Sequence, residues 1–188
     1  FSKDRAMQLK LLLDSMTKNA PLMFHPTVIY KSSNEFYQQG YDKLEQEGHC
    51  DFIKEEDFKK QTLDLLVNKG MYTCFFTDDD IIYKPIEDIQ TIERLFDAHI
   101  DLFCFSLRLG KNVTRCYTMQ SDNVLKGECE VDDDFIMWDW SKHYLDFGYP
   151  LSVDGHIFRT KDILKLTKGI SFQNPNTLEI AWQIYDNY

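Results

Sequence analysis

Three consecutive aspartates, Asp78, Asp79 and Asp80, follow directly after the apolar, β-prone stretch 72–76. This order predicts a buried strand whose carboxyl end carries concentrated negative charge. Adjacent carboxylates repel one another, and a bound cation relieves that repulsion. Oxygen ligands on a short turn suit Mg²⁺ or Mn²⁺, which proteins usually hold through one or two carboxylates and substrate phosphates. The stretch predicts a metal–nucleotide site, although a triple-acid turn by itself is also typical of a solvated surface.

Two further acids and one histidine are candidates for proton transfer or metal binding. Asp154 precedes Gly155, a residue that allows close substrate approach, so we predict Asp154 as the catalytic base, against the simpler interpretation of a turn residue. Glu179 is the alternative base, and it is equally typical of a helix first turn, where it complements the macrodipole. His156 is a candidate third metal ligand, although a lone histidine beside apolar residues is more often structural.

The elements that position these residues alternate between helix and strand. The alternation predicts βαβ units and a mostly parallel sheet covered by helices on both faces. Ligands bind beyond the carboxyl ends of such strands, where the polar loops 2–5, 31–34 and 77–80 would converge. Periodicity predicts the end of a strand at 1–5, strands over 26–30, 71–76, 100–107 and 151–159, and a possible edge strand at 116–119. It predicts helices over about 6–19, 35–47, 57–68, 85–99, 160–168 and 177–188.

Composition limits the classes of protein that fit. A chain of 188 residues with 43% hydrophobic residues supports one well-buried core, so we predict one domain. A formal net charge of −10 argues against a nucleic-acid binder, and no apolar run reaches the roughly 20 residues of a membrane span. The five cysteines include no CxxC pair, which favours free thiols in a reducing, cytoplasmic compartment. We expect a monomer.

The segment 76–80 resembles the Asp-X-Asp motif of nucleotide-sugar-dependent glycosyltransferases with the GT-A fold. The opening 1–9 is similar to the first strand and loop of that group, and 149–158 resembles its acceptor-side segment. The resemblance covers nearly the whole chain and extends to the glycosyltransferase domain of large algal viruses, the chloroviruses. It implies an α/β, Rossmann-like GT-A fold with a mostly parallel central sheet flanked by helices and a small mixed region on the acceptor side.

The resemblance also implies how the chain is divided and what the aspartates do. One domain over 1–188 would comprise a nucleotide-sugar half, about 1–109, and an acceptor half, about 110–188. Asp80 would bind Mn²⁺ or Mg²⁺ with Asp78 as its partner, and the metal would stabilise charge on the departing nucleoside diphosphate. Many relatives supply a further histidine ligand near the carboxyl terminus, whereas no histidine here follows His156.

Contacts to the nucleotide sugar are expected from the converging loops. Arg5 is suited to bind base or phosphate, and Asp4 to accept a hydrogen bond from sugar or base. The alternative is a solvated loop whose charges pair with each other. The prediction is weakest for Lys60, because lysines on an amphipathic helix are usually solvated. The predicted nucleotide-sugar contacts are Ser2, Asp4, Arg5, Lys31, Ser32, Lys60, Asp78 and Asp79.

The predicted function is transfer of a hexose from a UDP-sugar such as UDP-glucose to a hydroxyl of a glycan or glycoprotein acceptor, in the host cytoplasm if the protein is viral. A sugar-phosphate nucleotidyltransferase is an alternative, but its usual glycine-rich, basic first loop is absent from 2–5. A non-catalytic carbohydrate-binding or metal-binding module of the same fold is the other alternative.

Overall fold

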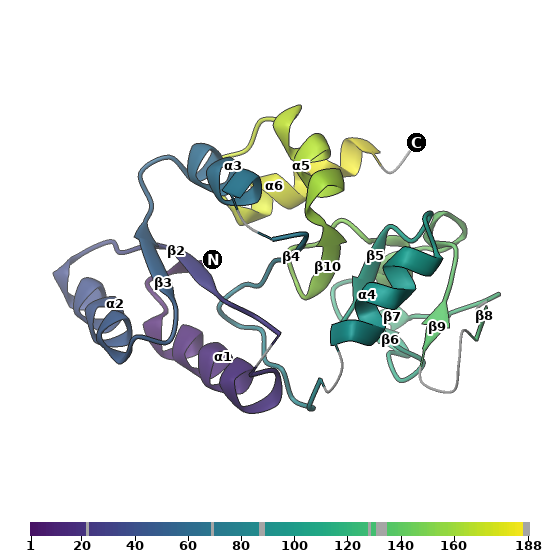
Figure 1. The fold of residues 1–188 in the computed structure, drawn as a ribbon, viewed down its shortest axis with the longest axis horizontal. Coiled ribbons are helices and arrows are strands. Elements are labelled where there is room, and N and C mark those ends of the chain that lie inside the picture. The colour runs from purple at the N-terminus through teal and green to yellow at the C-terminus, as the bar shows by residue number, and fades with distance from the viewer. Residues whose placement is uncertain (22, 69, 87–88, 128, 131–134, 186–188) are drawn as a thin grey trace.

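The computed structural model describes residues 1–21, 23–68, 70–86, 89–127, 129–130 and 135–185. It is a mixed α/β structure with six α-helices and two three-stranded sheets in this part of the chain. Figure 1 shows the first sheet with α1 and α2, a second sheet below α3, α5 and α6, and a region of short strands beside α4. No helix in the described ranges is long and apolar enough to cross a membrane.

The first sheet is parallel and has the order β1-β2-β3, from strands Ser2–Lys3, Thr27–Lys31 and Asp51–Lys54. Helices α1 (Ala6–Asn19) and α2 (Glu35–Glu47) make the crossovers, as the alternation predicts. The sequence pattern did not indicate β3.

The second sheet corrects the prediction of a mostly parallel centre. Its order is β4-β10-β5, from strands Tyr72–Cys74, His156–Arg159 and Cys104–Ser106, and β10 is antiparallel to both neighbours. Strands β4 and β5 therefore run in the same direction, as expected for two strands joined through α4 (Ile89–Ala98). The chain inserts β10 between them from the opposite end, so only the first sheet is parallel throughout.

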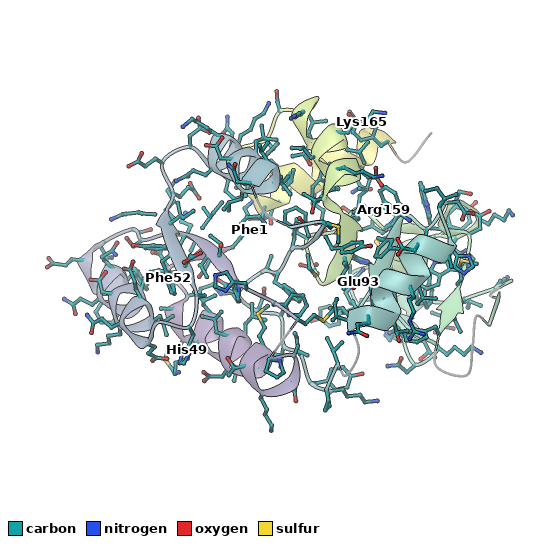
Figure 2. All side chains as sticks on the ribbon, in the orientation of Figure 1. Phe1, His49, Phe52, Glu93, Arg159 and Lys165 are labelled. Carbon is teal, nitrogen blue, oxygen red and sulfur yellow. The ribbon has the colours of Figure 1, made fainter. Side chains whose placement is uncertain are left out.

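The two sheets meet where β1 lies beside the end of β4. The Phe1 backbone nitrogen donates to the Phe76 carbonyl oxygen at 2.8 Å, and the Phe1 ring stacks on Phe75 with centroids 6.0 Å apart. Figure 2 labels Phe1 at this junction. The loop after β1 and the turn after β4 are consequently neighbours.

Three helices cover the core on one side of the second sheet. They are α3 (Phe58–Asn68), α5 (Thr160–Lys168) and α6 (Pro175–Trp182), and the 3₁₀ turn Gln183–Tyr185 follows α6. The fully buried Trp182 ring packs near Phe75 and Phe158, and its indole N–H donates to the Thr167 hydroxyl at 3.1 Å. Helix α6 starts with a capping box between Asn174 and Thr177, which fixes the position of its first turns.

The remaining elements are short and lie beyond β5. Two-stranded ladders pair β6 (Arg115–Cys116) with β7 (Ser121–Asp122), and β8 (Cys129–Glu130) with β9 (Ile136–Met137). The possible edge strand at 116–119 is thus confined to its first residue. Two 3₁₀ turns follow, Trp140–Lys142 and Leu145–Gly148. The predicted helix 85–99 is observed from Ile89, since 87–88 lie outside the described residues, as do 186–188 at the end of the last predicted helix.

Candidate functional site

Three carboxylates converge on the hydroxyl of Thr77. Its Oγ1 lies 2.9 Å from Asp79 Oδ1, 3.4 Å from Asp80 Oδ2 and 3.2 Å from Asp154 Oδ1. A hydroxyl carries one proton, so it satisfies only one of these oxygens at a time. The Thr77 backbone N–H adds one donor, to Asp80 Oδ2 at 2.9 Å. We call this group, which comprises Thr77, Asp79, Asp80 and Asp154, the Thr77 cluster. Donors from outside the group are Arg5, which contacts Asp79, and Ser152, which contacts Asp154.

The antiparallel insertion of β10 brings the cluster together. Asp154 directly precedes Gly155, which leads into β10, and β10 starts beside the end of β4, where Thr77 follows. The Gly155 N–H donates to the Phe75 carbonyl at 2.9 Å, with Gly155 at φ = 71° in the left-handed region. Glycine adopts this conformation without the steric cost that other residues incur. The predicted proximity of Asp154 to the aspartate turn is therefore observed.

Burial makes the charge on Asp80 expensive. Desolvation raises the Asp80 pKa from its usual value to about 6, hydrogen bonding from Thr77 lowers it, and the charges of Asp154 and Asp79 raise it further. A cation at this position would favour the ionised carboxylate and reverse the shift. The Thr77 cluster thus offers carboxylate oxygens, the ligands that a hard cation prefers, and the charge of Asp80 is the one that such a cation would relieve.

Arg5 lies against the same turn. Its Nη1 is 3.0 Å from Asp78 Oδ1 and its Nη2 is 3.3 Å from Asp79 Oδ2, and Asp78 is only 3% exposed. The preceding residue, Asp4, accepts from the Ser33 N–H at 2.6 Å and from the Ser33 hydroxyl at 2.5 Å. These bonds join the loops after β1 and β2, so the predicted meeting of 2–5, 31–34 and 77–80 is present.

Other predicted nucleotide contacts are engaged elsewhere. The buried Ser2 hydroxyl bonds Tyr41 Oη at 2.7 Å, in the core between β1 and α2. Lys31 pairs with Glu55 at 2.8 Å, and Ser32 donates to Gln38 at 2.7 Å. Lys60 lies on the exposed face of α3, 3.7 Å from Asp64, with 74% of its side chain accessible. The structure therefore brings Asp4, Arg5, Asp78 and Asp79 together but leaves these four residues in other surroundings.

Glu179 lies behind Asp154 rather than beside Thr77. Its Oε1 accepts from the Val153 N–H at 3.2 Å, and burial raises the pKa of its carboxyl group. The Ser152 hydroxyl lies 3.2 Å from Asp154 Oδ2. Ser152 and Thr77 are thus contacts of Asp154 that were not predicted. The available signal was a hydroxyl residue immediately before the three aspartates and another two positions before Asp154.

His156 faces different surroundings from the aspartates. It is 1% exposed, its Nδ1 lies 3.8 Å from Cys104 Sγ, and burial, followed by the charge of Arg108, lowers its pKa to about 3. Its Nε2 has no hydrogen-bond partner among the described residues. The imidazole is neutral near neutral pH. The predicted ligands Asp78, Asp80 and His156 are not gathered into one group.

The residues present nevertheless suit a divalent cation that is shared with a substrate. Across the described ranges, no three His, Cys, Asp or Glu side chains form a ready metal shell. A Mg²⁺ or Mn²⁺ ion that also binds phosphates needs only one or two protein carboxylates, and Asp80, whose pKa is raised by burial, can supply one of them. The donor set fits such an ion.

The comparisons with known proteins add no relative. No protein-family model matches the chain, and no curated protein matches its sequence. Chemically, the site offers carboxylates for a cation, a guanidinium for an anion, and a fixed acid, Asp154, for proton transfer. Together these groups could bind a cation and an anion and move a proton within one site.

Proposed function

We propose that this chain is a metal-dependent glycosyltransferase of GT-A type, which moves a hexose from a nucleotide sugar, a UDP-sugar in the first instance, to a hydroxyl of a glycan. The observation that carries the proposal is the convergence of Asp79, Asp80 and Asp154 on one hydroxyl, that of Thr77. The resemblance of 76–80 to the Asp-X-Asp motif gives this cluster its proposed role. The hydrogen bond between Phe1 and Phe76 brings the start of the parallel sheet next to the residues that follow β4, which is compatible with the proposed fold.

The geometry changes the proposed metal ligands in one respect. Asp80 remains the main ligand, since its buried charge gains most from a cation. Asp78, which is held 3.0 Å from Arg5, is proposed to pair with that guanidinium rather than to bind the metal. When bound, Mn²⁺ or Mg²⁺ supplies positive charge that stabilises the leaving nucleoside diphosphate.

Arg5 and the loop that carries it are the proposed binding surface for the donor. The guanidinium is 43% exposed and already bridges two aspartates, so a diphosphate could replace one of these carboxylates in a charge-assisted pair. The bonds between Asp4 and Ser33 fix the loops after β1 and β2 relative to each other. This preorganisation lowers the entropy lost on binding.

Asp154 is the proposed base for the acceptor. Its two carboxylate oxygens lie 3.2 Å from the hydroxyls of Thr77 and Ser152, respectively, which restrict its orientation. In the reaction, the acceptor oxygen bonds to the anomeric carbon, the carbon–oxygen bond to the diphosphate breaks, and Asp154 takes the acceptor proton. Glu179 is the alternative base, and its carboxylate is already engaged by the Val153 N–H.

A thermal-shift panel tests nucleotide and metal dependence together, because a ligand of the folded state raises the melting temperature. The panel compares UDP, GDP, ADP and UDP-glucose, each with and without Mn²⁺, on the wild type and Asp80→Asn. Asp122→Asn, which alters an exposed aspartate on β7, is the matched control. We expect UDP with Mn²⁺ to stabilise the wild type and the control but not Asp80→Asn. An equal shift in Asp80→Asn, or no shift with any nucleotide, would contradict the proposal.

A further inference from the structure

A cavity lies at the outer edge of β5, away from the Thr77 cluster. It has a volume of about 920 Å³ and is enclosed by the end of α4, β5, the loop 109–112 and the segment 135–142. No member of the Thr77 cluster lines it, and neither do Arg5 or Glu179. Small-molecule sites usually occupy about 300–1,000 Å³, so this cavity is large enough for a ligand of its own.

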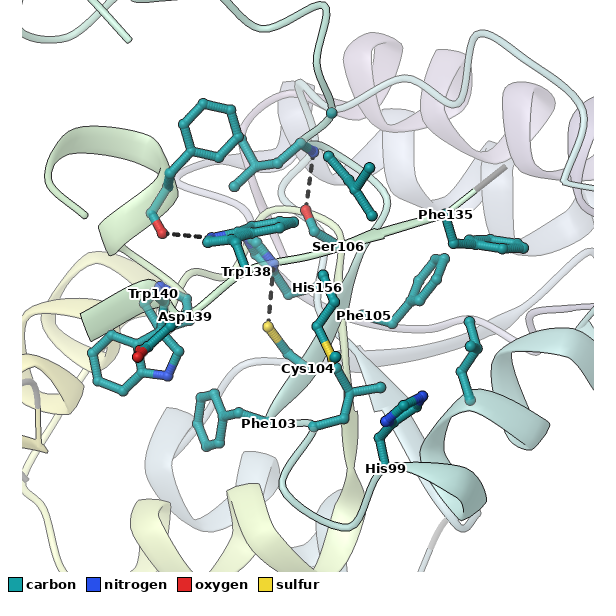
Figure 3. A pocket seen from close by; sticks show the side chains of 18 of the residues that line it. His99, Phe103, Cys104, Phe105, Ser106, Phe135, Trp138, Asp139, Trp140 and His156 are labelled. Atoms are coloured by element: carbon teal, nitrogen blue, oxygen red, sulfur yellow. Dashed lines mark hydrogen bonds between the residues drawn. The ribbon is translucent and has the colours of Figure 1, made fainter. Parts of the chain in front are cut away.

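Aromatic side chains form both ends of the cavity. Figure 3 shows Phe103 and Trp140 at one end and Phe105 and Phe135 at the other, with Cys104 and His156 between them. Ring centroids are 6.3 Å apart in the first pair and 5.7 Å in the second. All four rings are only half-buried, so apolar surface remains available to a ligand.

One wall is fixed before any ligand binds. The Trp138 indole N–H donates to the Phe147 carbonyl at 2.9 Å, and the two rings meet edge to face at 5.5 Å. A ring held by both a hydrogen bond and packing loses little entropy when a ligand stacks on it. The cavity is therefore preformed on this side.

The floor of the cavity is polar but uncharged. Its central residues are His156 and Cys104, with His156 Nδ1 3.8 Å from Cys104 Sγ, and burial raises the pKa of the Cys104 thiol to about 12. His156 Nε2 is buried and unpartnered within the described part of the chain, which leaves a costly unsatisfied polar atom beneath the aromatic walls. The ligand that suits this floor is neutral and carries groups that donate or accept hydrogen bonds.

The charged side chains that line the cavity carry no net positive charge. They are Asp101, Lys111, Asp139, Lys142 and Asp146. Lys142 lies 2.9 Å from Asp139, and Asp146 lies 3.5 Å from Arg108. A nucleotide or free phosphate is consequently a poor match for this cavity.

We propose that the cavity is a second ligand site and that it binds a neutral sugar ring of a glycan. A sugar ring has an apolar face that stacks on Phe103 or Trp140 and hydroxyl groups that bond His156 Nε2 and the surrounding polar atoms. Binding here needs neither metal nor nucleotide. The inference goes beyond the proposed function and stands without it, since each site is measured separately.

Saturation-transfer NMR tests this proposal with methyl glycosides of glucose, galactose, mannose, rhamnose, fucose and xylose on the metal-free protein. Trp140→Ala and Phe103→Leu alter the same end of the cavity, so the test survives if one variant fails to fold. Tyr144→Ala is the control, because Tyr144 is an aromatic residue of the neighbouring segment that is 87% exposed and outside the cavity lining.

We expect at least one glycoside to bind the wild type and Tyr144→Ala, and the folded cavity variants to bind it about fivefold to tenfold more weakly, as loss of an aromatic contact implies. Asp80→Asn should bind the same glycoside normally. Absence of binding by every glycoside would overturn the proposal, as would affinity unchanged in the cavity variants. Binding of octyl but not methyl glycosides would also overturn it, because the cavity would then recognise an alkyl chain.

Discussion

At the scale of single residues, Asp80 is the least compensated carboxylate of the Thr77 cluster. Arg5 also contacts Asp79 and Ser152 also contacts Asp154, whereas Asp80 has only the Thr77 hydroxyl and backbone N–H, and burial raises the pKa of Asp80 to about 6. Perturbed carboxylates of this kind concentrate at functional sites, although structural networks produce them too. Variants that remove one charge or one donor distinguish these possibilities.

The Asp80 carboxylate should destabilise the metal-free protein at neutral pH. Its pKa is higher in the folded than in the unfolded state, so the folded state binds more protons between about pH 4 and pH 6, and its contribution to the free energy of unfolding decreases as pH rises through that window. Asp80→Asn should therefore raise the metal-free melting temperature at pH 7.5, by about 2–4 °C for each kcal/mol regained. Differential scanning calorimetry at pH 4.5 and 7.5 checks this. A lower melting temperature at pH 7.5 would contradict it.

Affinity for Mn²⁺ should rise with pH as Asp80 loses its proton. Below about pH 6 Asp80 is protonated, so affinity for Mn²⁺ should fall by up to about tenfold per pH unit, because the ion must displace the proton. Calorimetric titration of Mn²⁺ between pH 5 and 8 measures this slope. Equal affinity across the range would show that Asp80 is not a ligand.

Thr77 should act by holding Asp80 and Asp154 in position. Thr77→Val removes the shared hydroxyl while nearly keeping the volume, and we expect Mn²⁺ affinity to fall on the order of tenfold, the usual effect of losing a group that orients a metal ligand. Thr77→Ser keeps the hydroxyl and should restore most of that affinity. If Thr77→Val and Thr77→Ser bind Mn²⁺ with equal affinity, the hydroxyl does not position the ligand.

At the scale of elements, the position of β10 decides which residues share a site. Its antiparallel entry between β4 and β5 places Asp154 beside the aspartate turn. The same strand carries His156 to the cavity at the β5 edge. Asp154 and His156, which Gly155 separates in the sequence, therefore lie in different places, Asp154 in the Thr77 cluster and His156 at the cavity.

The backbone conformation of Gly155 should affect both stability and metal binding, whereas that of Gly48 should affect stability alone. Gly155 and Gly48 both have φ = 71°, and an added Cβ would meet only side-chain atoms at 3.6 Å or more at Gly155 and nothing within 4 Å at Gly48. Gly155→Ala and Gly48→Ala should each lower the free energy of unfolding by about 1–2 kcal/mol through left-handed strain. Only Gly155→Ala should also weaken Mn²⁺ binding. Denaturant titration and calorimetry measure the two effects, and equal Mn²⁺ affinity in both variants would contradict this account.

The sequence predicts helices better than it predicts strand order. Helix α2 spans Glu35–Glu47 as expected, because Asn34 caps it by accepting from the Tyr37 N–H, and such caps are local signals. Strand β3 was missed because it has two apolar residues between Asp51 and Lys54, too few for a clear period. The antiparallel direction of β10 depends on tertiary pairing, which no local pattern reports.

The structure brings some of the predicted site residues together and separates others. Thr77, Asp79, Asp80 and Asp154 lie in one cluster, and the acidic turn after a strand and the glycine beside Asp154 are the sequence features that pointed to these acids. Lys31 and Ser32 were assigned to the site because they follow a strand end, yet Glu55 and Gln38 bind their side chains instead. Partners distant in sequence decided these cases, as they did for Thr77 and Asp154.

At the scale of the whole molecule, the proposed site forms where the parallel and the antiparallel sheet meet. The parallel sheet supplies Arg5 from its first crossover, and the antiparallel sheet supplies Asp80 and Asp154. The bond from Phe1 to Phe76 joins the two sheets where these residues lie. A formal net charge of −10 repels an anionic donor at long range, so binding of such a donor should depend on Arg5 and a cation at this edge.

The most direct test is turnover of UDP-glucose with Mn²⁺, measured as UDP release with and without a glycan acceptor mixture. The wild type and Asp122→Asn should release UDP in a reaction that chelation abolishes, whereas Asp80→Asn and Asp154→Asn should be slower by about 10²-fold or more, as loss of a metal ligand or a general base implies. Turnover at wild-type rates in Asp80→Asn and Asp154→Asn would contradict the account.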